Sequence, residues 1–333
     1  MSGVAITGWA AVAPNARLTN ADLEARVDTT EEWIVERTGI RERRVAAPDE
    51  STASLATEAS AEAIKRAGLT PHDIDLMIIA TVTPETLIPH TGAYVGERLG
   101  LRCGSFDLNA ACSGFVYASV VASSLLRSGL HHVLVVGAET LSRIIDPDDR
   151  GTCILFGDGA GAAVWSSSDD GTDALLGWDL GCDGSAAELL IIPAGGSARP
   201  ASSQTVAAGD HYLKMQGQEV FKRAVRAVVD SAHVTLERSG MRADDVRWFV
   251  PHQANGRIIV SAAHRLGFGE DRVISNLDRF GNTSSASIPL ALFEAVDDGR
   301  VHDGDLILLS GFGAGMTWAS ALIRWDTSRH VGP

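Results

Sequence analysis

The feature that most constrains the fold is an alternation of short apolar runs with longer helical patterns. In the first half, apolar runs bounded by turn residues predict buried strands at Val4–Thr7, Leu76–Ala80, Ser105–Leu108, Val133–Gly137 and Ala160–Trp165. Helices are predicted between them at Ser54–Ala67, Thr91–Leu99 and Gly114–Leu126. Strands that alternate with helices indicate an α/β fold, with helices on the faces of mixed sheets.

The second half of the chain repeats this order of elements. Helices are predicted at Gln218–Ser239, Asn255–Leu266 and Ile288–Asp297, and strands at Trp248–Val250, Leu306–Ser310 and Trp318–Trp325. A boundary is expected within Ser166–Thr172, which is rich in Ser, Asp and Gly. We therefore expect two similar units, residues 1–170 and 171–333, although no residue-level repeat is visible.

Composition argues against several classes of protein. The formal net charge of −14 over 333 residues opposes nucleic-acid binding. The longest apolar runs are far too short to cross a bilayer, and the first residues show no signal-peptide pattern, so we expect a cytoplasmic protein without membrane contact. The four cysteines form no C-x-x-C pair, which argues against a structural zinc site and a disulfide scaffold.

Cys112 is the candidate nucleophile in the segment Asp107-Leu-Asn-Ala-Ala-Cys-Ser-Gly-Phe. A strand is predicted to end just before it and a helix to begin at or just after it. The positive end of a helix and nearby backbone N–H groups favour a thiolate. A lone cysteine in an apolar segment is more often a small buried hydrophobe, and we interpret Cys103, Cys153 and Cys182 in that way.

Three further segments carry candidate polar groups. In Val-Pro-His252-Gln-Ala-Asn, a predicted strand brings a histidine to a loop, and Gly-Asn282-Thr-Ser-Ser-Ala-Ser is typical of a turn before a helix. Each segment taken alone is more simply explained as a local backbone partner or cap. The segment 310–318 matches no dinucleotide or phosphate-binding motif, but its glycines allow a backbone to approach a substrate closely.

Together, in this order and spacing, the four segments resemble the β-ketoacyl-acyl-carrier-protein synthase III family of the thiolase superfamily. The similarity runs nearly end to end and includes residues 28–43, 149–152 and 156–161. Elongating synthases would have a second His at Asn282, and thiolases a Cys in the glycine-rich segment. The resemblance implies a thiolase-like fold: two βαβαβαββ halves in five layers, α-β-α-β-α, assembled as a homodimer. The first half carries the nucleophilic Cys and the second carries His and Asn.

The resemblance also implies roles for these residues. Cys112 takes the acyl group of an acyl-CoA primer, and the backbone N–H groups of Cys112 and Ala314 form the oxyanion hole. His252 and Asn282 then donate hydrogen bonds to the enolate formed when malonyl-acyl carrier protein (malonyl-ACP) loses carbon dioxide. Neither a metal nor an organic cofactor is implied, since decarboxylation drives the reaction.

Binding residues are carried over from the family position by position. The coenzyme A site is expected at Thr29, Trp33, Arg37, Arg150, Gly217, Phe221, Ala254 and Asn255, with Trp33 and Arg150 around the adenine. Carrier-protein docking is expected at Lys222, Arg257 and Arg265. The acyl pocket is expected at Ile88, Leu155, Phe156 and Leu189, with Ile88 on a loop that reaches the pocket of the partner subunit.

Three functions remain open at this point. The first is the condensation that initiates fatty-acid biosynthesis. The second is a related acyltransferase of secondary metabolism, for polyketide priming or for ester or amide formation, and the third is a non-catalytic acyl-carrier binding protein. The intact set of Cys112, His252 and Asn282 argues against the third. The sequence does not indicate which acyl primer is used.

Overall fold

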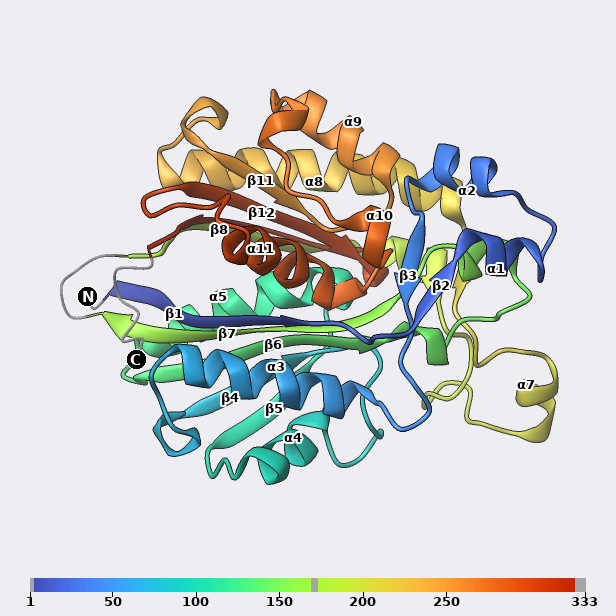
Figure 1. Cartoon of the computed structure of the whole chain (residues 1–333), viewed down its shortest axis with the longest axis horizontal. Helices are drawn as coiled ribbons and strands as arrows, with labels where there is room; N and C mark the ends of the chain where they lie inside the picture. Colours follow the sequence, from blue (N-terminus) through green and yellow to red (C-terminus); the bar gives the residue numbers. More distant parts are fainter. Residues whose placement is uncertain (1–2, 169–172, 327–333) are drawn as a thin grey trace.

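Two large sheets and three layers of helices form the body of the computed structural model, which describes residues 3–168 and 173–326 and also has two small two-stranded sheets, β2-β3 and β10-β9 (Figure 1). The first sheet has the order β1-β7-β6-β4-β5. Its strands are β1 (Gly3–Val12), β4 (Leu76–Ala80), β5 (Gly104–Leu108), β6 (His132–Thr140) and β7 (Asp158–Ser168). The second has the order β11-β12-β13-β8. Its strands are β8 (Leu175–Cys182), β11 (Trp248–Pro251), β12 (Leu306–Gly313) and β13 (Thr317–Arg324).

Six helices complete the five layers predicted from the family resemblance. The outer face of the first sheet is covered by α3 (Thr52–Arg66) and α4 (Thr91–Leu99), and that of the second by α8 (Gly217–Ser239) and α9 (Gly256–Leu266) (Figure 1). Between the sheets lie α5 (Gly114–Leu126) and α11 (Ser287–Asp297). The expected α/β, thiolase-like fold is therefore confirmed.

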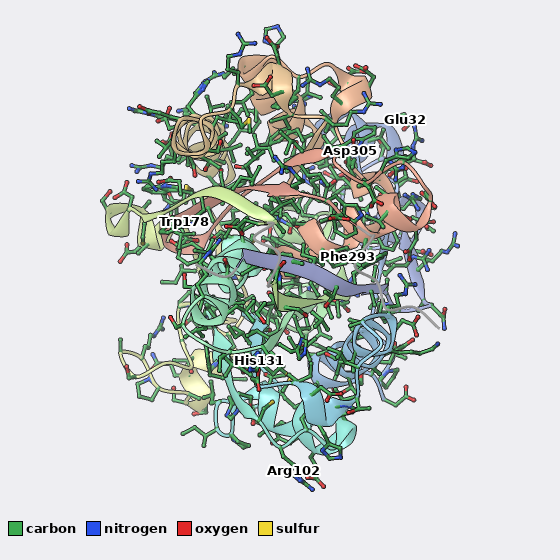
Figure 2. All side chains as sticks on the ribbon, turned by 90° about the vertical axis from the view of Figure 1, so that its left-hand side faces the viewer. Glu32, Arg102, His131, Trp178, Phe293 and Asp305 are labelled. Atoms are coloured by element: carbon green, nitrogen blue, oxygen red, sulfur yellow. The ribbon has the colours of Figure 1, made fainter. Side chains whose placement is uncertain are left out.

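The central layer explains why α5 and α11 are apolar around most of their circumference. A helix between two sheets buries several faces, unlike an amphipathic helix on an outer layer. Phe115 of α5 and Phe293 of α11 meet edge to face, with ring centroids 6.2 Å apart. Figure 2 shows Phe293 in this position between the two sheets. Apolar packing against both sheets thus fixes the two helices whose N-terminal ends border the site described below.

The two sheets correspond strand for strand, with one exception. The order β8-β13-β12-β11 matches β1-β7-β6-β4, but the counterpart of β5 is reduced to a single bridge between Phe249 and Val273. The β-strands and helices predicted from the sequence are present, with ends shifted by a few residues. The expected division at residue 170 lies outside the described residues.

Strand β8 was missed because its sequence, Leu-Leu-Gly-Trp-Asp-Leu-Gly-Cys, contains two glycines and an aspartate. It is the edge of the second sheet, and Trp178 on it remains 39% exposed (Figure 2). An edge strand packs on fewer neighbours, so its side chains carry a weaker apolar signal.

A group of short elements beside the ends of the sheets was also not predicted (Figure 1). It includes β2 (Arg17–Thr19), α1 (Asn20–Glu24), α2 (Glu31–Thr38), β3 (Glu42–Arg44), α6 (Arg150–Cys153), β9 (Leu190–Ile191), α7 (Ser203–Ala207), β10 (Lys214–Met215) and α10 (Leu277–Phe280). Arg43 of β3 is fully buried and donates to Asn20 Oδ1 at 2.8 Å and to the carbonyl of Ile154. Burial lowers the pKa of Arg43 to about 10. This buried guanidinium ties the short elements to the segment that precedes β7.

Candidate active site

Cys112 lies in a single turn, Ala111–Ser113, between the end of β5 and the start of α5. Ala111 has a φ of +47°, an unusual value for a residue with a side chain, and Cys112 is 8% exposed. The turn is held by the hydroxyl of Ser113, which donates to the carbonyl of Ala110 at 2.7 Å. The strand-to-helix placement predicted for the nucleophile is therefore present, at a backbone position under strain.

The electrostatic environment of this thiol differs from the expectation. Burial raises the pKa of Cys112 to about 12, and the negative charge of Glu139 acts in the same direction. Ser284 acts in the opposite direction, with a smaller effect on this pKa than burial has. Desolvation therefore opposes the thiolate-favouring effect expected from the end of α5, and the resting group is a thiol.

His252 follows β11 directly and is nearly inaccessible to solvent. Its backbone N–H donates to the carbonyl of Ser310 at 2.8 Å, and its ring packs edge-on against Phe312. Nδ1 lies 2.6 Å from the hydroxyl of Ser287. Because this hydroxyl accepts from the backbone N–H of Gln253, its own proton can go to Nδ1. This arrangement favours the tautomer with its N–H on Nε2, the nitrogen left for the cavity.

Burial lowers the pKa of His252 to about 3, from its ordinary value of 6.5. The folded protein therefore leaves this ring neutral while the unfolded chain takes up a proton below pH 6.5, so stability falls as pH drops. We expect His252 to account for a loss of about 1 kcal/mol between roughly pH 6.5 and 5.5. Urea unfolding of the wild type and of His252→Gln at both pH values measures this change in the free energy of unfolding. Equal pH dependence in the two proteins would contradict the prediction.

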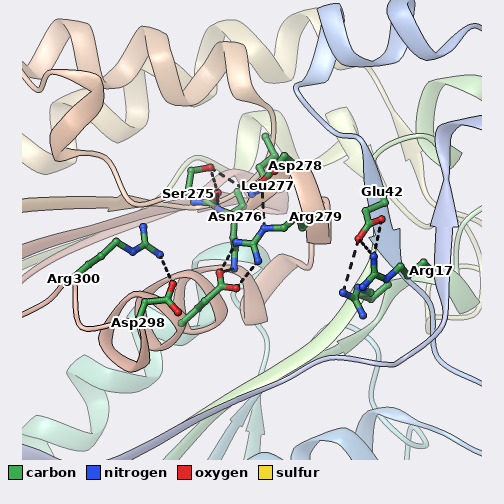
Figure 3. A network of polar contacts seen from close by, with 12 residues as sticks. Arg17, Glu42, Ser275, Asn276, Leu277, Asp278, Arg279, Asp298 and Arg300 are labelled. Atoms are coloured by element: carbon green, nitrogen blue, oxygen red, sulfur yellow. Dashed lines mark hydrogen bonds and ion pairs between the residues drawn. The ribbon is translucent and has the colours of Figure 1, made fainter.

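The loop that carries His252 is anchored by a polar network (Figure 3). Gln253 is fully buried, and its Oε1 accepts from the hydroxyl of Ser275 at 2.6 Å and the N–H of Asn276 at 3.2 Å. The amide of Asn276 donates to Glu294 of α11, which also accepts two hydrogen bonds from Arg279. The network joins the histidine loop to the helix whose first residue, Ser287, holds the imidazole.

Asn282 precedes α11 and is held through both backbone and side chain. Its N–H donates to the carbonyl of Leu155 at 2.8 Å, and its carbonyl accepts from Gly157 at 3.0 Å. Oδ1 accepts from the N–H of Ser284 at 2.9 Å. With Oδ1 engaged in this way, the NH2 group is what Asn282 offers to the cavity that it lines with His252.

Two cavities meet at Cys112. One, of about 640 Å³, is lined by Cys112, His252 and Asn282 and extends outward past Trp33 and Phe221. The other, of about 530 Å³, has predominantly apolar walls. Cys112, Phe156 and Leu190 line both. The thiol therefore stands at a junction, with one chamber large enough for an extended polar ligand and a second for an apolar chain.

Most of the predicted coenzyme A residues line the first cavity: Trp33, Arg37, Gly217, Phe221, Ala254 and Asn255. Thr29 and Arg150 are not among its lining residues. The guanidinium of Arg150 lies 5.0 Å from the ring centroid of Trp33 and donates to the carbonyl of Asp28. The two residues expected to enclose an adenine are thus in contact with each other, and Arg150 must move before a base can enter between them.

The predicted docking residues are divided between two locations. Lys222 and Arg257 line the first cavity, where Arg257 bonds to the backbone carbonyl of Glu36, and Lys222 pairs with Glu219 at 2.7 Å. Arg265 is exposed on α9 and is not one of the lining residues. The structure therefore brings two of the three docking candidates to the first cavity.

The predicted acyl-pocket residues also separate. Phe156 lines both cavities, Leu155 lines only the first, and Leu189 lines neither. Ile88 is 89% exposed on a surface loop. Apolar residues that the sequence reasoning missed line the second cavity: Val82, Leu141, Ile144, Ile191, Ile192 and Leu213. The run Leu189–Ile192 was a usable signal, since four consecutive large apolar residues outside a predicted strand indicate a buried or ligand-binding segment.

Ala314, expected to contribute to the oxyanion hole, lies in the turn Ala314–Met316 and lines the second cavity beside Cys112. The hydroxyl of Thr317 joins the two segments by donating to the carbonyl of Ala110 at 2.9 Å. Glycine is needed at position 313, because a Cβ there would lie 2.5 Å from the backbone nitrogen of Cys112. This close approach places the Ala314 turn against the Cys112 turn.

Neither a metal cluster nor a membrane span is found in the part of the chain that the structure describes. Residues 3–168 and 173–326 contain no group of three or more His, Cys, Asp or Glu side chains positioned to hold a metal ion. Within the same ranges no helix has the length and apolarity needed to cross a membrane.

Comparison with known proteins gives a consistent result. Residues 106–184 match the family 3-oxoacyl-[acyl-carrier-protein (ACP)] synthase III, and residues 236–325 match the 3-oxoacyl-[acyl-carrier-protein (ACP)] synthase III C-terminal family. The β-ketoacyl-[acyl-carrier-protein] synthase III of Desulfitobacterium hafniense is 47% identical over 98% of this chain and 99% of its own length.

Solved structures agree with these matches. The 3-oxoacyl-[acyl-carrier-protein] synthase III of Aquifex aeolicus superposes with a TM-score of 0.89 at 43% identity, covering 97% of this chain and 100% of that one. The priming β-ketosynthase of the R1128 polyketide pathway superposes with a TM-score of 0.90 at 38% identity, covering 97% and 96%.

Proposed function

The chain belongs to the 3-oxoacyl-[acyl-carrier-protein] synthase III family, and from this premise we propose how its residues condense an acyl-CoA primer with malonyl-ACP. The observation that carries the proposal is that Cys112, His252 and Asn282, from three separate segments, line one cavity, and that Cys112 also lines a second. The condensation, which initiates fatty-acid biosynthesis, is favoured over the acyltransferase alternative by the many curated β-ketoacyl synthases among the relatives.

Primer loading is proposed to occur from the first cavity. The pantetheine arm of acyl-CoA lies along Trp33 and Phe221, which brings its thioester to Cys112. The sulfur attacks the carbonyl carbon, and the oxygen takes negative charge between the N–H groups of Cys112 and Ala314. Coenzyme A then leaves, and the acyl group remains on the sulfur. The geometric support is the close contact of the Ala314 turn with the Cys112 turn.

Decarboxylation is proposed to use the other two polar groups. Malonyl-ACP enters by the same cavity, and its thioester oxygen accepts from Nε2–H of His252 and the NH2 of Asn282. Loss of carbon dioxide places negative charge on that oxygen, which these two donors stabilise. The resulting carbanion attacks the acyl-cysteine and releases β-ketoacyl-ACP. These steps draw on the chain's own groups and on the departing carboxylate, which supports the expectation that no cofactor is needed.

The acyl chain is proposed to occupy the second cavity. An acetyl group would leave most of its 530 Å³ unfilled, whereas each further buried methylene contributes about 0.8 kcal/mol. We therefore expect acyl-CoAs with about four to eight carbons to load on Cys112 more efficiently than acetyl-CoA. Intact-mass measurement of loading from competing acyl-CoAs tests this. Ile192→Trp narrows the cavity and is expected to shift the preference toward acetyl-CoA. A wild-type protein that loads acetyl-CoA most efficiently would contradict the assignment.

Carrier-protein docking is proposed for Lys222 and Arg257 at the first cavity and for Arg265 near the end of α9. Arg265 offers the cleanest test, because it lies outside the cavity lining and has no ion pair among the described residues. Carrier proteins of this family's systems are acidic, so the new carboxylate in Arg265→Glu would repel malonyl-ACP. We expect this variant to raise the KM for malonyl-ACP about fivefold or more and to leave primer loading unchanged. Arg226→Glu, on an exposed face of α8 paired with Asp230, is the matched control. Equal KM values in both variants would refute this docking role.

A homodimer is proposed on two observations. Strand β5 is an unpaired edge of the first sheet, and Phe106 on it is 37% exposed. The loop before α4 projects Leu87 and Ile88, which are 83% and 89% exposed. Pairing of β5 with a second copy would cover the edge, and the projecting loop is then available to the partner's acyl cavity. The two-unit division and the cytoplasmic location remain predictions.

One experiment tests the whole proposal. The protein is incubated with acyl-CoAs and then with malonyl-ACP, and both proteins are followed by intact mass. An acyl adduct on Cys112 that is discharged as the carrier gains the primer plus two carbons is expected. An adduct that never discharges onto malonyl-ACP would instead support the acyltransferase reading.

A further inference from the structure

Ser284 is a buried hydroxyl with no assigned purpose at the site. It is 2% exposed and has a φ of +48°, which costs a residue with a side chain about 1–2 kcal/mol. Its backbone N–H holds Asn282, but its Oγ has no hydrogen-bond partner of good geometry within the described residues. A strained backbone and an unpartnered buried polar atom together are typical of a functional position.

Two titratable groups, Cys112 and Glu139, lie near Ser284. Ser284 lines the same cavity as Cys112, and the next residue, Ser285, makes a hydrogen bond of 2.8 Å to Glu139 through its hydroxyl. A hydroxyl can accept a proton on one side while it donates its own on the other. Ser284 is therefore in a position to join the thiol to the carboxyl.

Glu139, at the end of β6, is completely buried and has no role in the steps above. Its Oε2 accepts from the hydroxyls of Thr81 and Thr83 and from the backbone N–H groups of Val82 and Thr83. All of these partners are neutral. Burial raises the pKa of Glu139, whereas the hydrogen bonds lower it.

The other carboxyl oxygen, Oε1, accepts from the backbone N–H groups of Val82 at 3.2 Å and Ser285 at 3.5 Å, and it lies 2.8 Å from the hydroxyl of Ser285. That hydroxyl is also 2.7 Å from the carbonyl of Ala80. A single hydroxyl proton serves only one of these two acceptors. A proton on Oε1 would satisfy both, by donating to Ser285 while Ser285 donates to Ala80. Glu139 thus has hydrogen-bond donors to both oxygens when it is ionised, and the Ser285 hydroxyl as an acceptor when Oε1 is protonated.

His252 is poorly suited to take the thiol proton. Its Nδ1 is engaged with Ser287, and its Nε2 is needed as a donor to the enolate. Burial keeps its pKa at about 3, so it is a weak base. Glu139 is better suited than His252 to accept this proton, because burial raises its pKa and the Ser285 hydroxyl can accept a hydrogen bond from its protonated form.

We propose that Glu139 takes the proton of Cys112 through the hydroxyl of Ser284 during primer loading, and returns it after condensation. The S–H bond breaks as an O–H bond forms on Ser284, whose own proton moves to Glu139. The sulfur keeps its electron pair and attacks the thioester, and coenzyme A leaves as a thiolate that takes a proton from solvent. When condensation later expels Cys112 as a thiolate, Glu139 returns the proton by the same path. One proton is consumed per cycle, together with the release of carbon dioxide.

This inference rests on the proposed role of Cys112, but it has a test independent of condensation. The rate of Cys112 alkylation by iodoacetamide is measured against pH in Glu139→Gln, which mimics the protonated carboxyl and its hydrogen bond to Ser285. We expect alkylation and primer loading near neutral pH to slow about 10²-fold. Simple loss of a nearby negative charge would lower the thiol pKa and speed alkylation, so the two explanations predict opposite signs.

Ser284→Gly, which suits the positive φ, is expected to slow alkylation to a similar extent, because it removes the hydroxyl and leaves Glu139 in place. Asp158→Asn removes another fully buried carboxyl, one bonded to Ser142 and the backbone of Ala46, and is expected to leave the alkylation profile unchanged. Thermal melting verifies that each variant is folded. Unchanged or faster alkylation in folded Glu139→Gln would overturn the relay, while loss of decarboxylation in Asn282→Ala would still support the proposed function.

Discussion

Asn282→Ala is expected to load the acyl primer on Cys112 almost as fast as the wild type, and to decarboxylate malonyl-ACP about 10²–10³-fold more slowly. Only the second half-reaction develops charge on the oxygen that the Asn282 amide is proposed to meet. Loading is followed by intact mass, and decarboxylation by release of labelled carbon dioxide. Equal loss in both half-reactions would contradict the role given to this residue.

Asn282→Asp separates donation from packing. The side chain keeps its volume and can still accept the N–H of Ser284, but it replaces the NH2 donor with a second acceptor oxygen. We expect the same loss of decarboxylation as in the alanine variant. Recovery of the rate in Asn282→Asp would show that Asn282 acts by filling space.

Gly313→Ala is expected to have the opposite effect, with primer loading reduced about 10²–10³-fold and decarboxylation changed far less. An added Cβ would lie 2.5 Å from the Cys112 nitrogen and 2.7 Å from the Ala111 Cβ. The Cys112 turn must shift, which displaces an oxyanion donor, whereas His252 and Asn282 are held by separate contacts. Overpacking of this kind also costs about 1–3 kcal/mol of stability.

Gly311→Ala is the matched control, two residues earlier on the same strand and therefore on the same face. Its Cβ would meet Ser113 at 3.2 Å and the Cys112 carbonyl at 3.3 Å, which a shift of a few tenths of an ångström relieves. We expect loading within about threefold of the wild type. If Gly313→Ala loads primer as fast as Gly311→Ala, the Ala314 turn does not supply the oxyanion hole.

The four variants together dissociate the two half-reactions. Loss of loading alone would indicate damage to the oxyanion hole, and loss of decarboxylation alone would indicate removal of the Asn282 donor. The control Gly311→Ala is expected to retain both half-reactions. A purely structural weakening would reduce both rates in proportion to the loss of folded protein, which thermal melting detects.

Predictions from the sequence were most reliable where the signal is local. The placement of Cys112 between a strand and a helix follows from about ten consecutive residues, and the structure has that arrangement. Strand β8 was missed because an edge strand with two glycines has little local pattern, and it is defined by pairing with β13. The lining of the second cavity was largely missed because Val82, Leu141 and Leu213 lie in separate segments.

The sequence by itself determined the alternation of strands and helices, the family resemblance and the identity of the candidate nucleophile. These properties reside in residue order and backbone preference. Only the tertiary structure brought Cys112, His252 and Asn282 to the same cavity, and placed the segment Ser284–Ser285 beside Glu139. It also decided that the thiol rests protonated and the imidazole neutral, because desolvation depends on everything packed around a group and not on its neighbours along the chain.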